Sequence, residues 1–315
     1  MNPLRPVILA ASASPRMQRI LTGMPVTAEI VRRFVAGEGR DELIAVAREL
    51  LAGRRLISVD FLGENTTDRA QADATAAEYL ALINDLAALN GFRDIAARTE
   101  VSVKMSALGQ ALPADGPAIA TENLRIVCTK AAQAGVWVTV DAEDHTTTEA
   151  TLAAVRELRA EFPWLGAVLQ AHLHRTEADC RELSGPGSRI RLCKGAYREP
   201  HTVAYQRSAE VNDSYLRCLE ILMGGDGYPM VATHDPVLIL AAERLATETG
   251  RGPDRFEHQM LYGIRDPEQL RLAAAGNAMR VYVPYGSQWY GYLTRRLAER
   301  PANLTFFLRA LVSKS

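Results

Sequence analysis

The sequence has few cysteines and little net charge, and each absence narrows the class of protein. Four cysteines are scattered along 315 residues without a Cys-x-x-Cys spacing, which suits a reducing compartment and argues against a disulfide framework or a zinc knuckle. The formal net charge is −1, so composition gives no reason to expect nucleic-acid binding. We therefore expect a protein of the cytoplasm without a nucleic-acid partner.

Long apolar runs are also missing. No run approaches the ~18 residues of a membrane-spanning helix. The apolar stretch near the start, residues 7–11, is shorter than the roughly 7–15 residues in the core of a secretory signal. Hydrophobic residues make up 48% and charged residues 23% of the chain, the balance of a globular protein in water.

What the sequence does contain is a regular alternation of two kinds of segment from about residue 55 onward. Runs rich in β-branched apolar residues alternate with longer segments of helical period, which favours a parallel sheet. Eight such runs are what a closed (β/α)8 barrel of the TIM type needs. The expected strands span 55–63, 100–108, 135–142, 164–172, 189–197, 228–235, 255–263 and 277–286, and the expected helices include 74–90, 117–134 and 204–223.

An open, doubly wound sheet is the alternative architecture. Its usual marker, a glycine-rich turn from a strand into a helix, is missing. The glycine cluster at 224–227 follows a helical pattern and precedes a strand, as expected of a helix stop and turn. Residues 1–54, which include the amphipathic segment 41–53, are expected to form a helical appendage to one barrel domain, 55–315.

Polar residues gather near the ends of the expected strands. Active sites of such barrels lie at the carboxyl ends of the strands, and polar side chains in strands buried on both faces need partners or ligands. The residues expected at this edge are Asp60, Glu64, Lys104, Asp141, Glu143, Asp144, His145, Gln170, His172, His174, Arg191, Cys193, Lys194, Tyr197, Thr233, His234, Asp235, Glu257, His258, Gln259, Arg280, Tyr282 and Tyr285. Their number indicates a site without naming its chemistry.

Two chemistries can be argued from residue types alone. The Asp, Glu and His residues of 141–145, with the histidines of 172–174, could ligate a divalent ion for hydrolysis or lyase chemistry. Lys104 or Lys194 could form an imine, because a lysine buried in a strand can have a depressed pKa. The blander alternatives are a solvated acidic loop and a fixed positive charge for an anionic ligand.

A third chemistry, that of a flavin oxidoreductase, rests on strings near the strand ends. The motifs SVDFLGE, LCKGAY, ATHD, RVYVPYG and YLTRRLAERPAN occur in that order at 58–64, 192–197, 232–235, 280–286 and 292–303. Over residues 55–310 they resemble the proline dehydrogenase family. The resemblance implies FAD on a distorted (β/α)8 barrel, a final helix over the barrel mouth, oxidation of L-proline to 1-pyrroline-5-carboxylate, and transfer of electrons to a quinone.

The most specific element is the pattern Y-x-x-R-R-x-x-E after the eighth expected strand. Tyr292, Arg295, Arg296 and Glu299 share one stripe of a helix. Alone, this stripe suits a solvated charged face as well as a two-arginine fork for a carboxylate. By the resemblance, Arg295 and Arg296 hold the carboxylate of proline, and Lys104 is a third cation beside them. The resemblance adds Asp141 and Glu299 to the same ionic network.

The resemblance also implies an apolar pocket for the pyrrolidine ring. Tyr197, Tyr282 and Tyr292 would form an aromatic wall for its methylene face, and Leu261 would cover it. A tyrosine at 282 leaves little room for a ring hydroxyl, which favours proline over 4-hydroxyproline. Glu64 is a hypothetical lid that pairs with Arg295 over the substrate.

The positions that match FAD contacts are Gln170, Arg191, Cys193, Lys194, Gly195, Ala196, Thr233 and His234. A guanidinium at Arg191 near flavin N5 would tune the redox potential. Gln170 would meet the pyrimidine edge with its donor and acceptor, while Thr233 and His234 would reach the adenosine part. Cys193 is expected to be a small core residue. No residue is assigned as a general base, and no metal is expected.

The resemblance carries expectations about partners as well. Quinone as acceptor implies peripheral contact with the inner face of the cell membrane. The apolar segment 304–312 could contribute to that contact or to core packing. The chain is expected to be monofunctional, so a separate pyrroline-carboxylate dehydrogenase would consume the product. A barrel that only binds a ligand is the non-enzyme alternative, and the set of Lys104, Tyr282, Arg295, Arg296 and Glu299 argues against it.

Overall fold

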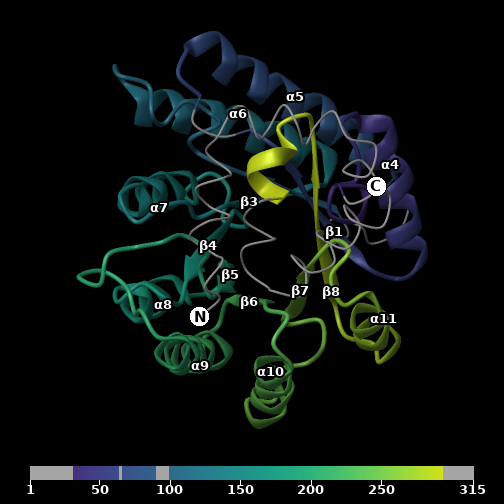
Figure 1. Ribbon diagram of the computed structural model, residues 1–315, viewed down its shortest axis with the longest axis vertical. Helices are drawn as coiled ribbons and strands as arrows, with labels where there is room; N and C mark the ends of the chain where they lie inside the picture. The colour runs from purple at the N-terminus through teal and green to yellow at the C-terminus, as the bar shows by residue number, and fades with distance from the viewer. Residues whose placement is uncertain (1–30, 64–65, 90–98, 294–315) are drawn as a thin grey trace, which may run out of the picture.

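The computed structural model describes residues 31–63, 66–89 and 99–293. Eight parallel strands form a closed barrel in sequence order, and β8 pairs with β1 to complete it. A helix precedes β1 and another lies between each pair of successive strands, so that the helices surround the barrel (Figure 1). The closed (β/α)8 architecture is confirmed.

The elements, in chain order, are α4 (Arg40–Ala52), β1 (Leu56–Phe61), α5 (Arg69–Leu89), β2 (Thr99–Val103), α6 (Gly116–Ala134), β3 (Trp137–Val140), α7 (Thr148–Leu158), β4 (Gly166–Gln170), α8 (Thr176–Leu183), β5 (Arg189–Cys193), α9 (Ser208–Gly224), β6 (Tyr228–Ala232), α10 (Pro236–Glu248), β7 (Glu257–Leu261), α11 (Asp266–Ala274) and β8 (Met279–Tyr285). Each expected strand contains most or all of one observed strand. The glycine cluster at 224–227 lies between α9 and β6, where a helix stop was expected.

The two faces of the strands differ in polarity. Successive residues of a strand point to opposite sides, and in β2 the pattern alternates Glu100, Val101, Ser102 and Val103. The valines belong to the hydrophobic core between strands and helices, whereas Glu100 and Ser102 bond to side chains inside the barrel. The apolar core is therefore a shell around the barrel, and the barrel interior is polar.

The core shell also satisfies the polar ends of its large side chains. Tyr79 of α5 and Tyr215 of α9 are fully buried. Their hydroxyls donate to the backbone carbonyls of Ser102 and Leu192, at 2.8 and 3.0 Å. A buried tyrosine needs such a partner, because an unpaired hydroxyl in an apolar environment is costly.

The segment before β1 packs against the barrel. Helix α4 contacts β1, β8 and α5, and its residues Leu43, Ala47, Leu50 and Leu51 join the core shell. Buried Arg55 forms an ion pair with Asp266 at the start of α11. The proposed boundary between an appendage, 1–54, and a barrel, 55–315, stays a prediction.

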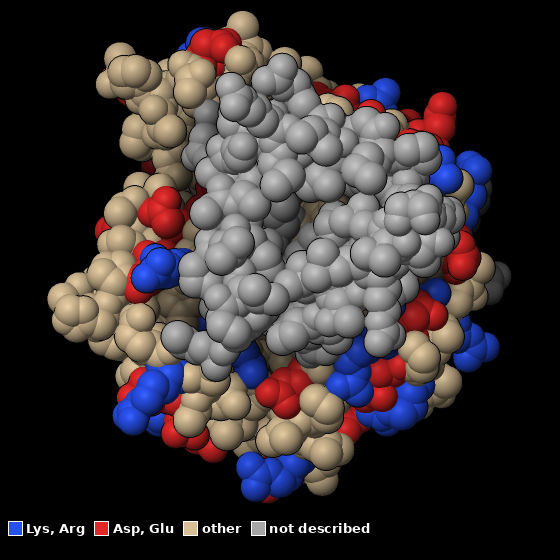
Figure 2. All heavy atoms as spheres, in the orientation of Figure 1, with Lys and Arg blue, Asp and Glu red and all other residues tan. Residues whose placement is uncertain are grey.

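Charged side chains connect neighbouring helices on the outside. Arg40 pairs α4 with α5, Arg125 pairs α6 with α7, and Arg156 pairs α7 with α8. Arg217 pairs α9 with α8, and Arg271 pairs α11 with α10. Basic and acidic side chains are accordingly interspersed around the rim of the face in Figure 2. Within the described part of the chain, no helix is long and apolar enough to cross a bilayer.

Three sequence expectations need correction. The helix expected from residue 204 begins at Ser208, because Ala204 forms an isolated antiparallel bridge with Leu173. Glu257 and Arg280 were expected at the carboxyl edge, yet they lie at the amino ends of β7 and β8 and pair with each other. His258 faces the core shell, where it packs against Phe256, and does not point into the interior.

Candidate active site

Four polar side chains meet at the carboxyl ends of four adjacent strands, β8, β1, β2 and β3. Lys104, directly after β2, places its Nζ 2.5 Å from Oδ1 of Asp60 and 3.8 Å from Oδ2 of Asp141. The Tyr282 hydroxyl donates to Oδ2 of Asp141 at 2.8 Å. The structure thus brings together Lys104, Asp141 and Tyr282, three of the expected substrate-binding residues, and adds Asp60.

Arg191 of β5 crosses the interior below this group. Its Nε donates to Gln259 at 2.6 Å. Its Nη1 donates to Ser102 and Asp141, and its Nη2 to Ser58 and Glu100, at 2.6–3.0 Å. A guanidinium has five N–H groups, so these five bonds use all of them. The Arg191 guanidinium also lies 5.4 Å from the centre of the Tyr282 ring.

A second layer of charge closes the amino-terminal end of the barrel. Arg189 donates to Oε2 of Glu100 at 2.6 Å, and its guanidinium lies 3.6 Å from the centre of the Trp137 ring. Arg280 forms a bidentate pair with Glu257 at 2.7 and 3.0 Å. Burial of unpaired charges would be very costly, and here each charge has an opposite partner.

The electrostatics of the interior follow from burial and these partners. Burial opposes ionisation of Glu100, but the three guanidiniums around it, Arg189 first, hold its pKa well below the usual value. Burial raises the pKa of Tyr282 far above its usual value, and the carboxylates of Asp141 and Asp60 raise it further. Glu100 is therefore ionised and the Tyr282 hydroxyl keeps its proton near neutral pH.

The residues expected to contact a flavin lie on the other side of the mouth, at the ends of β4, β5 and β6. Gln170 ends β4 and is buried. Lys194 follows β5 and binds Asp235 at 2.9 Å. Thr233 follows β6, and its hydroxyl accepts a hydrogen bond from the backbone N–H of Asp235. Asp235 itself is the N-cap of α10, where its side chain accepts a hydrogen bond from the backbone N–H of Val237.

The short loop after β5 is shaped by a glycine. Gly195 has φ +101°, and a Cβ there would lie 1.5 Å from Nδ1 of His172. Only glycine fits this place, so the backbone passes directly over the imidazole. The neighbouring residues Cys193, Ala196 and Tyr197 are half-buried, and Cys193 Sγ lies 3.6 Å from the Leu169 carbonyl oxygen.

Three further expected residues have defined places. Leu261 ends β7, and its backbone N–H donates to Nε2 of His234 at 3.0 Å. Tyr292 is in the helical stretch 289–293. It belongs to a second apolar cluster with Phe34, Val35 and Leu62, against which Tyr282 packs. Four expected residues, Glu64, Arg295, Arg296 and Glu299, fall outside the described residues.

The residues considered for a metal site or for an imine have partners within the protein. Glu143 accepts hydrogen bonds from the backbone N–H and hydroxyl of Ser106, and His145 pairs with Glu199. His174 packs on the ring of Tyr205. Over residues 31–63, 66–89 and 99–293, no group of three or more His, Cys, Asp or Glu residues is arranged to hold a metal ion. The two lysines considered for an imine, Lys104 and Lys194, form ion pairs with Asp60 and Asp235.

Sequence reasoning assigned no role to several residues that build the site. Ser58, Glu100, Ser102 and Gln259 form the surroundings of Arg191, and Asp60 binds Lys104. The period-two alternation of polar and apolar residues in β2 and β5 was the available signal. It places the polar members together inside the barrel once closure of the sheet is assumed.

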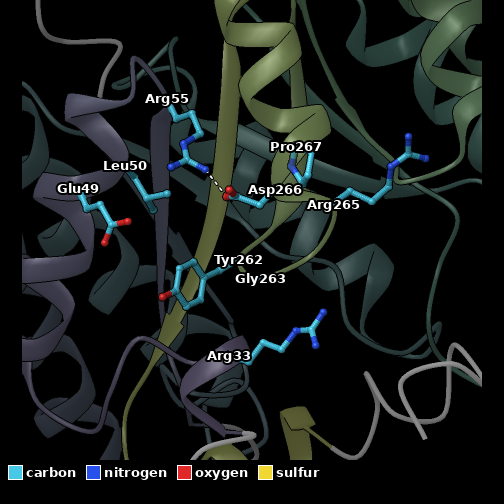
Figure 3. A pocket seen from close by; sticks show the side chains of 9 residues that line it. All are labelled: Arg33, Glu49, Leu50, Arg55, Tyr262, Gly263, Arg265, Asp266 and Pro267. Carbon is cyan, nitrogen blue, oxygen red and sulfur yellow. Dashed lines mark hydrogen bonds and ion pairs between the residues drawn. The ribbon is translucent and has the colours of Figure 1, made fainter. Parts of the chain in front are cut away.

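A cavity of about 560 Å³ lies apart from this site, between the end of α4 and the loop from β7 to α11 (Figure 3). Its lining includes Glu49, Arg55, Tyr262 and Asp266. Arg55 points to Asp266 across one wall. Arg55 and Asp266 of this cavity thus pair with each other, as Lys104 and Asp60 do at the barrel mouth.

Comparisons with known proteins agree on one family. The family model for proline dehydrogenase matches residues 44–309. Proline dehydrogenase 1 of Bacillus subtilis (strain 168) is 36% identical over 285 residues, covering 90% of this chain and 91% of that protein. Proline dehydrogenase of Deinococcus radiodurans is 36% identical over 314 residues, covering 98% and 97%.

A solved structure of similar fold belongs to a longer protein. Proline utilization A (PutA) from Bdellovibrio bacteriovorus, inactivated by N-propargylglycine, matches with a TM-score of 0.79 at 27% identity. The match covers 86% of this chain and 32% of that one, so this chain spans about a third of its length. Bifunctional protein PutA of Escherichia coli (strain K12) is 29% identical over 313 residues, which are 24% of its length.

Proposed function

The chain belongs to the proline dehydrogenase family and is an oxidoreductase that acts on proline, and we propose that it oxidises L-proline to 1-pyrroline-5-carboxylate with bound FAD and a quinone acceptor. The observation that carries the proposal is the group of Lys104, Asp60, Asp141 and Tyr282 at the barrel mouth. It offers a positive charge for a carboxylate and carboxylate oxygens as hydrogen-bond acceptors beside an aromatic ring, as a small cyclic imino acid requires.

Substrate binding follows from the chemistry of these residues. Lys104 provides a buried positive charge for the carboxylate, together with Arg295 and Arg296, which the family motif assigns to the same task. Charge-assisted hydrogen bonds of this kind contribute about 1.5–3 kcal/mol each. The rings of Tyr197, Tyr282 and Tyr292 and the Leu261 side chain supply apolar surface for the methylene groups. We retain Glu64 as a lid and Glu299 as a partner of the arginines.

Two features support a flavin on the opposite side of the mouth. Among the described residues, Oε1 of buried Gln170 accepts no hydrogen bond, so an acceptor is available for the N–H of a flavin pyrimidine edge. The second feature is Gly195, which lets the backbone after β5 lie directly against the His172 imidazole, where any side chain would collide. We propose that Gln170, Lys194 and the Gly195–Ala196 backbone hold the flavin ring, while Thr233 and His234 approach the adenosine of FAD.

When bound, the flavin supplies the two-electron oxidant that takes a hydride from C5 of proline. Arg191 contributes a fixed positive charge between the two halves of the mouth. Because its five N–H groups are already bonded, a direct hydrogen bond from Arg191 to the flavin requires one of them to be released. Cys193, between Leu192 and Lys194, contributes volume to this wall.

The proposal extends to partners and place. Electrons would leave through a quinone, with the protein in the cytoplasm and in peripheral contact with the membrane. A separate pyrroline-carboxylate dehydrogenase would consume the product. We propose that the Tyr282 ring leaves little room for a 4-hydroxyl. We therefore expect L-proline to be preferred to 4-hydroxyproline by at least about 10-fold in kcat/KM, because an unmatched hydroxyl must be desolvated.

The test is the visible spectrum of the purified protein before and after L-proline is added without oxygen. We expect flavin bands near roughly 380 and 450 nm that bleach on addition. The Arg295→Ala variant should need at least about 10-fold more proline for the same bleaching, since one charge-assisted contact is lost. A protein that remains colourless and inactive after reconstitution with FAD would contradict the proposal.

A further inference from the structure

Asp60 has an unusual environment for a buried carboxylate. Its side chain is fully buried at the end of β1, in register with Ser102 of β2 and Pro284 of β8. Oδ1 accepts a hydrogen bond from Lys104 Nζ at 2.5 Å. Oδ2 is also buried, and within the described residues it accepts no hydrogen bond. A buried carboxylate oxygen that accepts no hydrogen bond costs free energy unless a ligand provides the donor.

The neighbouring carboxylates are already occupied. Asp141 receives Ser102 and Arg191 on Oδ1 and Tyr282 on Oδ2. Glu143 receives two donors of Ser106. Asp60 is therefore the carboxylate in the Lys104 group with an oxygen still available for a ligand.

The oxidation of a cyclic imino acid needs such an oxygen. The substrate amine binds deprotonated and retains one N–H, which is a hydrogen-bond donor. As the C5–H bond breaks, its electron pair leaves with the hydrogen as hydride to the flavin, and the nitrogen lone pair forms the C=N bond. Positive charge develops on nitrogen in this step, and a fixed carboxylate beside it stabilises the transition state more than the ground state.

We propose that Asp60 is a catalytic residue whose Oδ2 accepts the ring N–H of proline and stabilises the positive charge that develops there. Lys104 on Oδ1 keeps the carboxylate oriented and contributes its own charge to the substrate carboxylate. The inference rests on the proposed function and extends it, because it supplies a recognition group for the nitrogen that the family motifs leave unassigned.

The protonation state of Asp60 gives the proposal a pH dependence. The pKa of Asp60 is raised to about 6. Burial is the main cause and the Asp141 charge adds to it, while Lys104 and the Tyr282 hydroxyl act in the opposite direction. Tyr79 of α5 and Tyr285 of β8 also interact electrostatically with this carboxylate, although their hydroxyls donate to the Ser102 carbonyl and to Glu78. A protonated Asp60 cannot stabilise cationic nitrogen, so kcat/KM for proline should fall as the pH drops through about 6.

The experiment compares two non-oxidisable ligands of the flavin-loaded enzyme that differ at one ring atom. Pyrrole-2-carboxylate offers a ring N–H, and furan-2-carboxylate offers an oxygen in its place. Both dissociation constants are measured at pH 8 from the change in flavin absorbance. In the unmodified protein we expect the pyrrole acid to bind at least about 10-fold more tightly, the effect of one charge-assisted hydrogen bond.

Asp60→Asn, which preserves shape, should reduce this ratio to within about 3-fold of unity. The matched control is Asp85→Asn, at a half-buried ion pair between Asp85 of α5 and Arg40 of α4 on the outside of the barrel. It should keep the ratio of the unmodified protein. If Asp60 only oriented Lys104, both ligands would weaken equally and the ratio would persist, which overturns the proposal.

Two further outcomes are decisive. Should Asp60→Asn fail to fold or to hold flavin, the ratio is measured in the unmodified protein between pH 8 and 5. It should fall with pH, and a constant ratio rejects the role of Asp60. Should the unmodified, flavin-loaded protein not be reduced by proline, the proposed function fails first. Reduction by proline together with an unchanged ratio in Asp60→Asn defeats only the inference about Asp60.

Discussion

A single residue, His258, shows how strongly the face of a strand sets the chemistry of a side chain. Its neighbours in β7, Glu257 and Gln259, bond inside the barrel, whereas His258 points into the apolar shell against Phe256. Neither ring nitrogen has a hydrogen-bond partner among the described residues. Burial, together with the nearby charge of Arg271, lowers the pKa of His258 to about 4.

This lowered pKa predicts an acid-sensitive stability. The unfolded chain binds a proton at a pKa near 6.5 and the folded protein only near 4, so His258 favours folding fully above about 6.5 and loses that contribution as the pH falls toward 4. At pH 5 the loss is about 2 kcal/mol. The unfolding free energy is measured by urea titration at pH 7 and at pH 5. In His258→Leu the difference between these two values should be smaller than in the unmodified protein by about 2 kcal/mol. The exposed control His201→Gln should not, and equal differences in all three proteins would contradict this account.

At this scale the sequence predicted some roles and missed others. Lys104 and Asp141 directly follow strands, so a barrel places them at the mouth whatever their partners. The open oxygen of Asp60 could not be predicted, because it depends on which oxygen Lys104 reaches from the neighbouring strand. The position of His258 was also missed, since it requires the inward face of β7 to be known.

At the scale of elements, ion pairs connect most neighbouring helices around the barrel. Arg125 of α6 is the strongest example, with carboxylates of Glu122, Glu157 and Glu161 at or below 3.0 Å. Exposed pairs of this kind contribute little one by one and are screened by salt. A network that shares one planar guanidinium loses less side-chain entropy per bond than separate pairs do.

We expect Arg125→Gln to lower the unfolding free energy by about 1 kcal/mol in dilute buffer and by less than about half of that in 1 M NaCl. Arg181→Gln is the matched control, because its one pair with Glu177 is at 3.6 Å, and it should cost less than about 0.5 kcal/mol. The measurement is urea unfolding at both salt concentrations. A loss at Arg125 that is the same in both would show that packing of the side chain, and not charge, is responsible.

Element boundaries were predicted less well than element identity. All eight strands were found because β-branched runs alternate with helical periods over the whole barrel. The start of α9 was missed by four residues. Gln206 donates to the carbonyls of Glu199 and Ala204, and these contacts hold the chain in a loop where local periodicity continues a helix. Such tertiary contacts are not visible in sequence periodicity.

At the scale of the whole molecule, the barrel closes around paired charges. Arg280 and Glu257 lie on adjacent strands β8 and β7, both fully buried, and Nη1 of Arg280 also donates to the carbonyl of Ile57 in β1. This pair therefore spans the place where the last strand meets the first. Breaking a buried pair on one side leaves an uncompensated charge, which is more harmful than removing both partners.

We expect Glu257→Gln to lower the unfolding free energy by about 3–5 kcal/mol. The double variant Glu257→Leu with Arg280→Met should cost less than the sum of the two single changes, because no charge remains unpaired. Urea unfolding of the four proteins of this cycle measures the coupling. The exposed control Glu248→Gln, whose pair with Arg244 is at 3.7 Å, should change stability by less than about 0.5 kcal/mol. Additive losses at 257 and 280 would be the contrary result.

A barrel filled with ion pairs has a calorimetric consequence. Exposure of apolar surface raises the heat capacity of the unfolded chain, whereas exposure of polar surface lowers it. Unfolding here exposes the apolar shell together with the arginines and carboxylates of the interior. The heat-capacity increment per residue should lie below that of barrels with aliphatic interiors. The dependence of stability on temperature is correspondingly shallower, so the protein should retain a larger share of its maximal stability on cooling as well as on warming.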